Sequence, residues 1–506
     1  MNQRVLCLGN NTEDTDFKTR LLAAEARVQC HGLLSDLDNT VTLDSIENVG
    51  YYHTSVYDIE YGKLVDLANH FGTVIVLDQP KDQYSHPDAF LKTIKLAKEI
   101  KTSVKFLNQN YANEIDFFKN LVDTNPSFCI FPFIELLTNQ RDDGQTTVCC
   151  RSMTPITYAS DIVNFATDPH YKVIRDKMLQ GELIPDYCNS CYKLENKNIQ
   201  SARKQETVEW ANRLDLSSLE DLLLIEHPAY YEIRPSNVCN LQCRMCGPGS
   251  SQLIGKEYRR LNLISKLPPE QRSNFDIIDF TNLKKLYVAG GEPTAMPEFY
   301  NFVDKCIEEN RVFEFIVNTN GTKLNQRFKK QLAQLPNMQF IVSIDGVDQI
   351  NHYIRWPSIW TAIVDNIQYL RDHGHVVSIN TTVSIYNVVR LYELFQWVDK
   401  TFPGVLIHAE LAGNGDQDLL SALRFPDSRL ARDRLLPIKQ LNCYKNDGLL
   451  KSFVDGIISH YDNDPVVDQN KLQQFFEFND KLDQSRNIQL KNYIPELEKY
   501  RNRNEC

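Results

Sequence analysis

Three closely spaced cysteines are the feature that most limits what this chain can fold into. Cys239, Cys243 and Cys246 form a Cys-x3-Cys-x2-Cys run. Three thiolates from one loop are one ligand short of a closed four-ligand centre. An iron–sulfur cluster bound in this way keeps one iron open for a small molecule. Taken alone, the run is equally compatible with part of a zinc site.

A second motif follows about forty residues later. Gly290, Gly291, Glu292 and Pro293 come directly after the apolar run 286–289, which is typical of a strand. Two glycines at a strand end allow close backbone approach, and the carboxylate offers an anion for an ammonium group. Alone, such a tetrapeptide is an ordinary turn. In order with the cysteines, it indicates a binding site at a strand end.

Together these motifs resemble the radical S-adenosylmethionine (SAM) superfamily over residues 228–412. The resemblance implies that the three cysteines bind a [4Fe-4S] cluster whose open iron takes S-adenosylmethionine. It implies that Gly-Gly-Glu-Pro binds the methionine end of that cofactor. The implied reaction is reductive cleavage to a 5′-deoxyadenosyl radical, which takes hydrogen from a substrate. An electron donor of the flavodoxin or ferredoxin type is the implied partner.

Polar residues end the next apolar runs, in the order the family shows. By the resemblance, four of them contact the carboxylate and ribose of the cofactor: Asn318, Thr319, Ser343 and Asn387. Arg355 is a further candidate for cofactor or substrate contact, with a surface ion pair as the alternative. Helix-period segments lie between these runs, so we expect an α/β fold with a partial, TIM-like (β/α)6 barrel.

Upstream cysteines form a second set. Cys129, Cys149, Cys188 and Cys191, with Gly144 five residues before Cys149, offer four thiolates from two turns. This spacing resembles the SPASM and twitch domains, which implies that the four hold an auxiliary [4Fe-4S] cluster, with Cys150 spare. A structural zinc site is the alternative. Such domains usually follow the barrel, whereas this segment precedes it. Complete ligation by cysteine favours electron transfer over direct substrate binding.

The chain of 506 residues is long enough for several domains. In the N-terminal part, the patterns predict strands at 4–8 and 72–77 and a helix at 89–100. The expected parts are an α/β domain of unknown role at 1–122, a SPASM/twitch-like iron–sulfur domain at 123–205, the radical SAM barrel at 228–412, and a helical C-terminal region at 413–506 that caps the barrel.

Composition and net charge indicate the cellular compartment and the kinds of partner to expect. Thirteen cysteines, an odd number grouped at metal spacings, argue against a disulfide framework and favour a reducing, cytoplasmic compartment. We see no signal peptide and no segment long enough to span a membrane, so no membrane partner is expected. A net charge of −11 disfavours broad capture of nucleic acid.

Three functions remain compatible with the sequence. The first is a radical enzyme that modifies a peptide or protein, which is common among SPASM and twitch relatives. The second is a radical enzyme that acts on a small molecule, such as a sugar, a nucleotide or a modified base. The third is a non-catalytic iron–sulfur protein that uses the barrel as a binding scaffold.

Overall fold

A computed structural model of the chain describes the backbone of four strands within residues 5–106, and residues 117–139, 144–152, 154–196, 201–268, 275–336, 338–412 and 419–501. These residues fall into two compact units, described separately here. The first comprises 1–128 with 200–222, and the second comprises 129–199 with 223–506.

The first unit contains a parallel four-stranded sheet in the order β2-β1-β3-β4. Its strands are β1 (Val5–Leu8), β2 (Tyr51–Thr54), β3 (Thr73–Val76) and β4 (Ser103–Phe106). The strands predicted at 4–8 and 72–77 correspond to β1 and β3, whereas the helix predicted at 89–100 lies outside the described residues. Among the described residues of this unit the helices are α5 (Phe117–Thr124), α9 (Ala202–Arg213) and α10 (Leu219–Leu223), which ends at the boundary of the unit.

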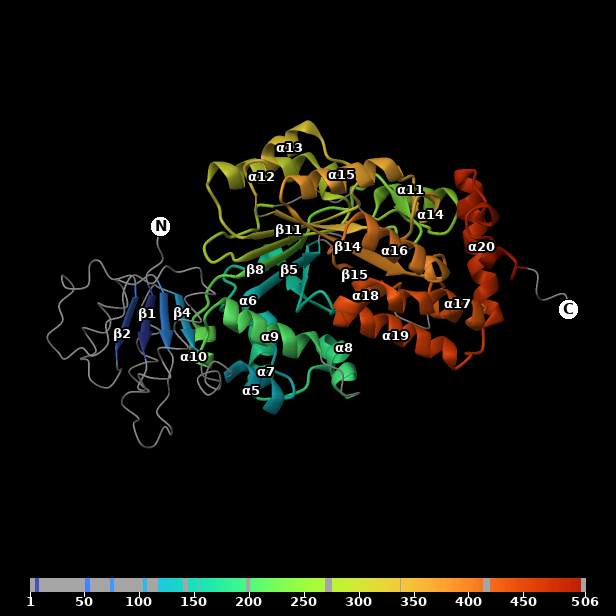
Figure 1. Cartoon of the computed structure of the whole chain (residues 1–506). Helices are drawn as coiled ribbons and strands as arrows, with labels where there is room; N and C mark the ends of the chain where they lie inside the picture. The colour runs from blue at the N-terminus through green and yellow to red at the C-terminus, as the bar shows by residue number, and fades with distance from the viewer. Residues whose placement is uncertain are drawn as a thin grey trace. The chain divides into compact units, whose positions relative to one another are not determined.

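A nine-stranded sheet organises the second unit, in the order β15-β14-β12-β11-β10-β8-β5-β6-β7 (Figure 1). The seven strands from β15 to β5 are parallel, and β6 and β7 extend the edge antiparallel. The strands are β5 (Glu135–Asn139), β6 (Gln145–Thr147), β7 (Pro155–Tyr158), β8 (Tyr230–Arg234), β10 (Lys285–Val288), β11 (Glu314–Thr319), β12 (Met338–Ser343), β14 (Val376–Val383) and β15 (Ile407–Leu411).

Strands and helices alternate from β8 to β15. The intervening helices are α11 (Gln252–Arg260), α12 (Pro297–Glu308), α13 (Gln326–Leu332), α14 (Gln349–Ile354), α15 (Trp360–Asp372) and α16 (Leu391–Thr401). Figure 1 shows α12, α13 and α15 together on one side of the strands. The predicted α/β class and partial (β/α)6 barrel are therefore confirmed, with six parallel strands from β8 to β15.

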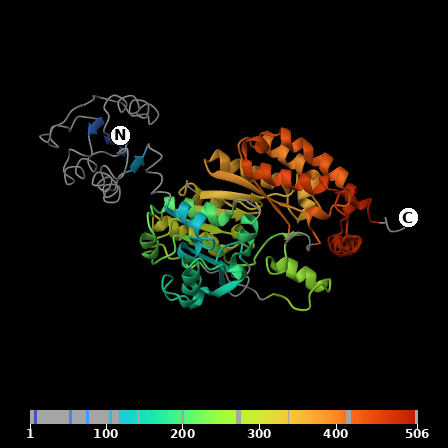
Figure 2. The same ribbon diagram turned by 90° about the horizontal axis from the view of Figure 1, so that it is seen from below.

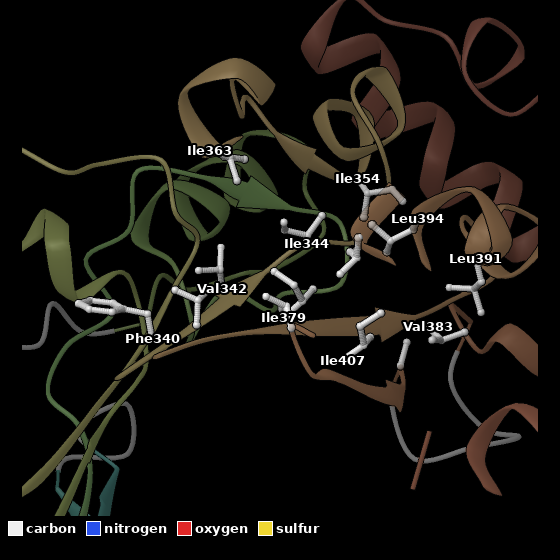
Figure 3. Packing of buried hydrophobic residues seen from close by; sticks show 14 of the residues in the cluster. Phe340, Val342, Ile344, Ile354, Ile363, Ile379, Val383, Leu391, Leu394 and Ile407 are labelled. Carbon is white, nitrogen blue, oxygen red and sulfur yellow. The ribbon is translucent and has the colours of Figure 1, made fainter. Parts of the chain in front are cut away.

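The two faces of the barrel sheet differ because side chains alternate along each strand. On β12, Phe340 and Val342 are buried, whereas Ile341 and Ser343 are partly exposed. The buried face packs under the helices, and Figure 3 shows side chains from strands and helices meeting there, among them Ile363. Burying a large aliphatic side chain stabilises the fold by about 1.5–3 kcal/mol. The opposite, half-buried face is left to line the inside of the barrel.

The cysteine-rich segment continues the barrel sheet. Its strand β5 follows α6 (Phe131–Ile134) and pairs in parallel with β8, so that Glu135 faces Tyr230. Two helices follow β7, namely α7 (Pro169–Leu179) and α8 (Pro185–Glu195). Asp168 caps α7, and Gly181 follows it at a φ of +76°. The Cys188–Cys191 pair, predicted to lie in a turn, lies on α8, because Pro185 begins a helix.

The C-terminal region is helical, as predicted. Its helices are α17 (Ser428–Leu435), α18 (Asn442–Asn446), α19 (Gly448–Asp462), α20 (Gln469–Arg486) and α21 (Pro495–Glu498). Figure 2 shows these helices, coloured orange to red, beside the last strands of the sheet. A search of the described residues finds no helix that is both long and apolar enough to cross a membrane.

Candidate active site

The loop that carries the three cysteines begins at the carboxyl end of β8. Cys243 lies on the short strand β9 (Gln242–Cys243), which pairs antiparallel with β13 (Arg355–Trp356). The N–H of Cys246 donates to the carbonyl of Cys243 at 3.2 Å. The N–H of Leu241 donates to the Sγ of Cys239 at 3.4 Å. Local hydrogen bonds therefore fold the loop back on itself.

The thiols lie in a setting that favours a cationic partner. Burial raises the pKa of Cys239 to about 12. Cys243 and Cys246 share a hydrogen bond, which together with burial raises the pKa of Cys243. A bound metal would offset the free-energy cost of ionising these buried thiols, because it stabilises thiolates. Within the described ranges, no three His, Cys, Asp or Glu side chains stand at the spacing of bound-metal ligands. Whether a cluster fits this loop therefore depends on the type of its donors, which are three cysteine sulfur atoms on one loop.

The two glycines after β10 bring that strand end against the cysteine loop. Gly290 and Gly291 have φ angles of +82° and +56°, which L side chains rarely adopt. A Cβ on Gly291 would overlap the carbonyl oxygen of Val238, and one on Gly290 would lie 2.7 Å from the Cβ of Arg234. The N–H of Glu292 donates to the carbonyl of Val238 at 2.8 Å. The absence of side chains is what lets the motif touch the residue before Cys239.

The Glu292 carboxylate is buried, with 1% of the residue exposed. Its Oε1 accepts from the N–H and hydroxyl of Thr294, at 3.1 and 2.6 Å, and from the hydroxyl of Thr319 at 2.7 Å. Its Oε2 accepts from the N–H of Asn320 at 2.7 Å. Burial raises the pKa of Glu292, although these donors oppose the shift. The carboxylate thus joins the ends of β10 and β11, and its proposed contact with the cofactor would have to share these bonds.

The other strand-end residues lie in two places. Asn318 donates to the hydroxyl of Tyr287 at 2.9 Å and accepts from Ser343 at 3.1 Å, so β10, β11 and β12 are linked across the half-buried face. Asn387 is completely buried and donates to the carbonyls of Asp345 and Thr382. Asn318 and Ser343 are therefore placed where a ligand could reach them, whereas the amide of Asn387 is used to hold the backbone.

Sequence reasoning missed a polar link between the cysteine loop and β11. The amide of Asn320 donates to the side-chain carbonyl of Asn240 at 2.9 Å, and Asn240 donates to the hydroxyl of Thr322 at 2.8 Å. Asn240 is the residue directly after Cys239. The Asn-Thr-Asn-Gly pattern marked this strand end, but nothing local pointed to Asn240 as its partner.

Arg355 forms a buried ion pair. Its Nε lies 2.6 Å from Oδ2 of Asp345, with 9% and 0% of the two side chains exposed. Arg355 stands opposite Cys243 in the β13–β9 pair. Burial opposes its charge, but Asp345 and Cys243 together keep the pKa of Arg355 above its ordinary value. The sequence allows a surface ion pair for Arg355. The ion pair exists but is buried, because Arg355 lies on β13, which pairs with β9.

The second cysteine set lies just before α6, just after β6 and on α8. Cys149 is half-buried two residues after β6, and Cys129, Cys188 and Cys191 are buried. Burial, followed by the charges of Glu135 and Cys129, raises the pKa of Cys149. The hydroxyl of Thr154 donates to the carbonyl of Asp186 at 2.5 Å, which ties the segment after Cys149 to α8. All described cysteines are free of disulfides, so their sulfur atoms can accept a metal or cluster.

The two cysteine sets lie toward opposite ends of paired strands. Cys129 precedes β5, and β6 runs antiparallel to β5, so Cys149 returns to the amino end of β5. The loop with Cys239 leaves the carboxyl end of β8, which runs parallel to β5. Glu232 and Arg234 lie between them on β8, paired at 2.5 Å. Burial raises the pKa of Glu232.

Residues 233–398 match the radical SAM superfamily. Among curated proteins, the chain is 24% identical over 256 residues to GTP 3′,8-cyclase of Pectobacterium atrosepticum, covering 48% of this chain and 76% of that protein. It is 27% identical over 160 residues to the mycofactocin maturase MftC of Mycobacterium tuberculosis, covering 31% of this chain and 38% of that one. The chain thus spans less than half of the maturase.

Solved structures give weaker likenesses. SuiB of Streptococcus suis, bound to the precursor peptide SuiA, has 15% identity and a TM-score of 0.32, with 54% of this chain and 59% of SuiB covered. Native anSMEcpe with AdoMet and the Cp18Cys peptide has 16% identity and a TM-score of 0.30, with 41% and 58% covered. TM-scores of this size carry no argument about function.

Proposed function

This chain carries a radical SAM domain, and we propose that it is an enzyme that uses S-adenosylmethionine to abstract a hydrogen atom from a peptide or protein. The observation that carries the proposal is the contact between the Cys239–Cys246 loop and the Gly-Gly-Glu-Pro motif through Val238. When bound, the [4Fe-4S] cluster would supply an electron that cleaves S-adenosylmethionine to methionine and a 5′-deoxyadenosyl radical.

The residues of the chain would divide the remaining tasks. Cys239, Cys243 and Cys246 would hold the cluster, and the backbone at Gly290 and Gly291 would approach the methionine end of the cofactor. Asn318 and Ser343 would face the ribose from the half-buried side of the sheet, where they are hydrogen-bonded to each other. The C-terminal helices beside the last strands would close the barrel and exclude water, which protects a carbon radical from unwanted hydrogen donors.

The chemistry of the half-buried face favours a peptide over a nucleoside triphosphate. At the carboxyl ends of its strands this face carries neutral or acidic groups: Tyr287, Asn318, Ser343, Thr382 and Glu410. Arg234 is on the same face but is paired with Glu232. A triphosphate calls for several unpaired cations, whereas hydroxyls and amides suit a peptide backbone. The similarity to GTP 3′,8-cyclase keeps GTP as the second candidate.

We further propose that Cys129, Cys149, Cys188 and Cys191 hold an auxiliary [4Fe-4S] cluster, with zinc as the alternative. Four cysteines complete the ligation, so its role would be to pass electrons. Anaerobic metal and sulfide analysis of the purified chain separates the two cases. About eight irons per chain support two clusters, and about four irons with one zinc support a structural zinc site.

Free thiols throughout the described ranges fit a reducing, cytoplasmic setting.

The test of the main proposal measures 5′-deoxyadenosine. The reconstituted, dithionite-reduced chain should form it from S-adenosylmethionine, and Cys243→Ala should abolish its formation. Cys306→Ala is the matched control, because Cys306 is buried on α12 outside the site. A synthetic peptide library should raise the yield, and GTP should not. Full turnover by the Cys243 variant would refute the assignment, and consumption of GTP would favour the second candidate.

A further inference from the structure

Arg244 stands inside the cysteine loop, between Cys243 and Cys246. It is 1% exposed, although its side chain is long and charged. Its backbone N–H donates to the carbonyl of Ile354, and its Nε to the carbonyl of Tyr353, both at 2.9 Å. A guanidinium buried this deeply must have every donor matched, because an unpaired buried charge is costly.

The remaining donors of Arg244 reach the C-terminal helix α20, which lies near α11 and α14 in Figure 1. One terminal nitrogen donates to Oδ1 of Asn479 at 2.7 Å, and the other to Oδ1 of Asp483 at 2.5 Å. The guanidinium carbon lies 3.7 Å from the ring centre of Tyr353, which adds a cation–π contact. A residue of the cysteine loop is thus joined to a helix more than two hundred residues later.

The acceptors on α20 are themselves held in place. The hydroxyl oxygen of Tyr353 lies within hydrogen-bonding distance of Oδ1 of Asn479 and of both carboxylate oxygens of Asp483, at 3.0–3.2 Å, and its single hydrogen can bind one of them at a time. The N–H of Leu490 donates to Oδ2 of Asp483 at 2.7 Å. The hydroxyl of Tyr386 donates to Oδ1 of Asn479 at 3.0 Å. Such a buried hydrogen-bond network favours one geometry, which would pass to the loop through Arg244.

A second buried ion pair on α20 provides a comparison. Arg486 donates twice to Glu257 on α11, at 3.0 and 2.7 Å, with 2% and 1% of the two side chains exposed. This pair docks the same helix and is buried to a similar degree, but its hydrogen bonds and ion pair run between α11 and α20 and do not involve the cysteine loop. Removing this pair therefore weakens the docking of α20 without removing the hydrogen bonds of Arg244.

We propose that Arg244 is a positioning residue that holds the Cys243–Cys246 half of the loop against α20, so that this helix governs retention of the radical cluster. The inference rests on the proposed function. Other supports of the loop come from the barrel, through Val238, Asn240 and the β9–β13 pair, and from the start of α11, where the hydroxyl of Ser251 donates to the carbonyl of Leu241. The C-terminal region is then part of the radical centre rather than a cover over the fold.

The test compares two double substitutions in the reconstituted full chain. Arg244→Met with Asp483→Leu removes both charges of the loop pair, and Glu257→Leu with Arg486→Met removes both charges of the control pair. Each variant is challenged with EDTA, and the electron paramagnetic resonance signal that changes on adding S-adenosylmethionine is followed in time. We expect this signal to decay about tenfold faster in the first variant, in the range found for supporting residues around metal ligands. In the control it should stay within about twofold of the parent.

Equal decay in the two variants at equal melting temperatures would overturn the inference, because α20 would then act by docking alone. Asp483→Asn preserves the shape of the site and carries the test if the first double variant does not accumulate. It should speed the decay in the same direction, and an unchanged decay rate counts against the inference. A parent chain without any signal responsive to S-adenosylmethionine would contradict the proposed function instead.

Discussion

Glu292 and Thr319 are hydrogen-bonded across the ends of β10 and β11, with 2.7 Å between Oε1 and Oγ1. Four donors converge on this carboxylate, and none of its contacts in the structure is an ammonium group. Glu292, which the motif indicates as an anion for the cofactor, therefore also holds the ends of β10 and β11 together. We call this set of hydrogen bonds the clamp.

The first prediction concerns this clamp. Glu292→Gln places an amide NH2 opposite a donor, so one hydrogen bond becomes a repulsion. We expect the free energy of unfolding to fall by about 1–3 kcal/mol, the cost of leaving a buried polar group unmatched. Urea denaturation measures it. Glu308→Gln, exposed near the end of α12, is the control and should change stability by less than about 0.5 kcal/mol. Equal effects of the two substitutions would contradict the clamp.

Gly291→Ala should cost more than another glycine substitution at a similar backbone angle. The matched control is Gly404→Ala, whose φ is +81° and whose added Cβ would meet nothing within 4 Å. The control pays about 1–3 kcal/mol of backbone strain alone. At Gly291 the Cβ also overlaps the carbonyl of Val238, so the strand end must move off the cysteine loop. Iron content after reconstitution should drop in Gly291→Ala only, and an equal drop in both would show that strain suffices.

The third prediction compares a buried with an exposed ion pair. Asp345→Asn leaves Arg355 buried without its counter-ion, which should cost about 3–5 kcal/mol. Asp304→Asn breaks the pair with Arg327, in which both side chains are more than two-fifths exposed, and should cost less than about 1 kcal/mol. Thermal or urea unfolding of both variants tests the difference. A small loss for Asp345→Asn would mean that water reaches Arg355.

Stability should fall as the solution is acidified, in part through His375. Burial against Phe340 lowers the pKa of His375, so the folded state resists its protonation. The unfolded chain takes up the proton first, and stability is lost as pH falls through the ordinary histidine value of about 6.5. His375→Gln should reduce the loss of the urea midpoint between pH 7.5 and pH 5.5. His408→Gln, at an exposed position on β15, should leave that loss as in the parent. Identical pH profiles for the parent and His375→Gln would refute the role.

Much of the barrel, and the placement of the two candidate-site motifs after strands, was predictable because the signals are local. The cysteine spacing and the Gly-Gly-Glu-Pro pattern each lie within ten residues, and the strand–helix alternation follows from hydrophobic period. The Cys188–Cys191 pair was misplaced in a turn, although Pro185 is also a normal first residue of a helix.

The parts that were missed depend on contacts between distant segments. Nothing near Arg244 indicates that Asp483 will pair with it, because that contact needs α20 to pack in a particular orientation. The run at 135–139 gave no sign that it would join the barrel sheet beside β8, since strand pairing is fixed by the tertiary fold. Asp345 and Arg355 likewise meet only when β13 pairs with β9.

The parallel pairing of β5 with β8 also defines a length along the sheet. Tyr230 and Arg234 lie four residues apart on β8, which corresponds to roughly 13 Å of strand. Cys129 comes before the amino end of this interval, and the loop with Cys239 leaves its carboxyl end. A molecule that ran beside β8 from one end of the interval to the other would extend over about that length, which is the reach of some four residues of extended polypeptide.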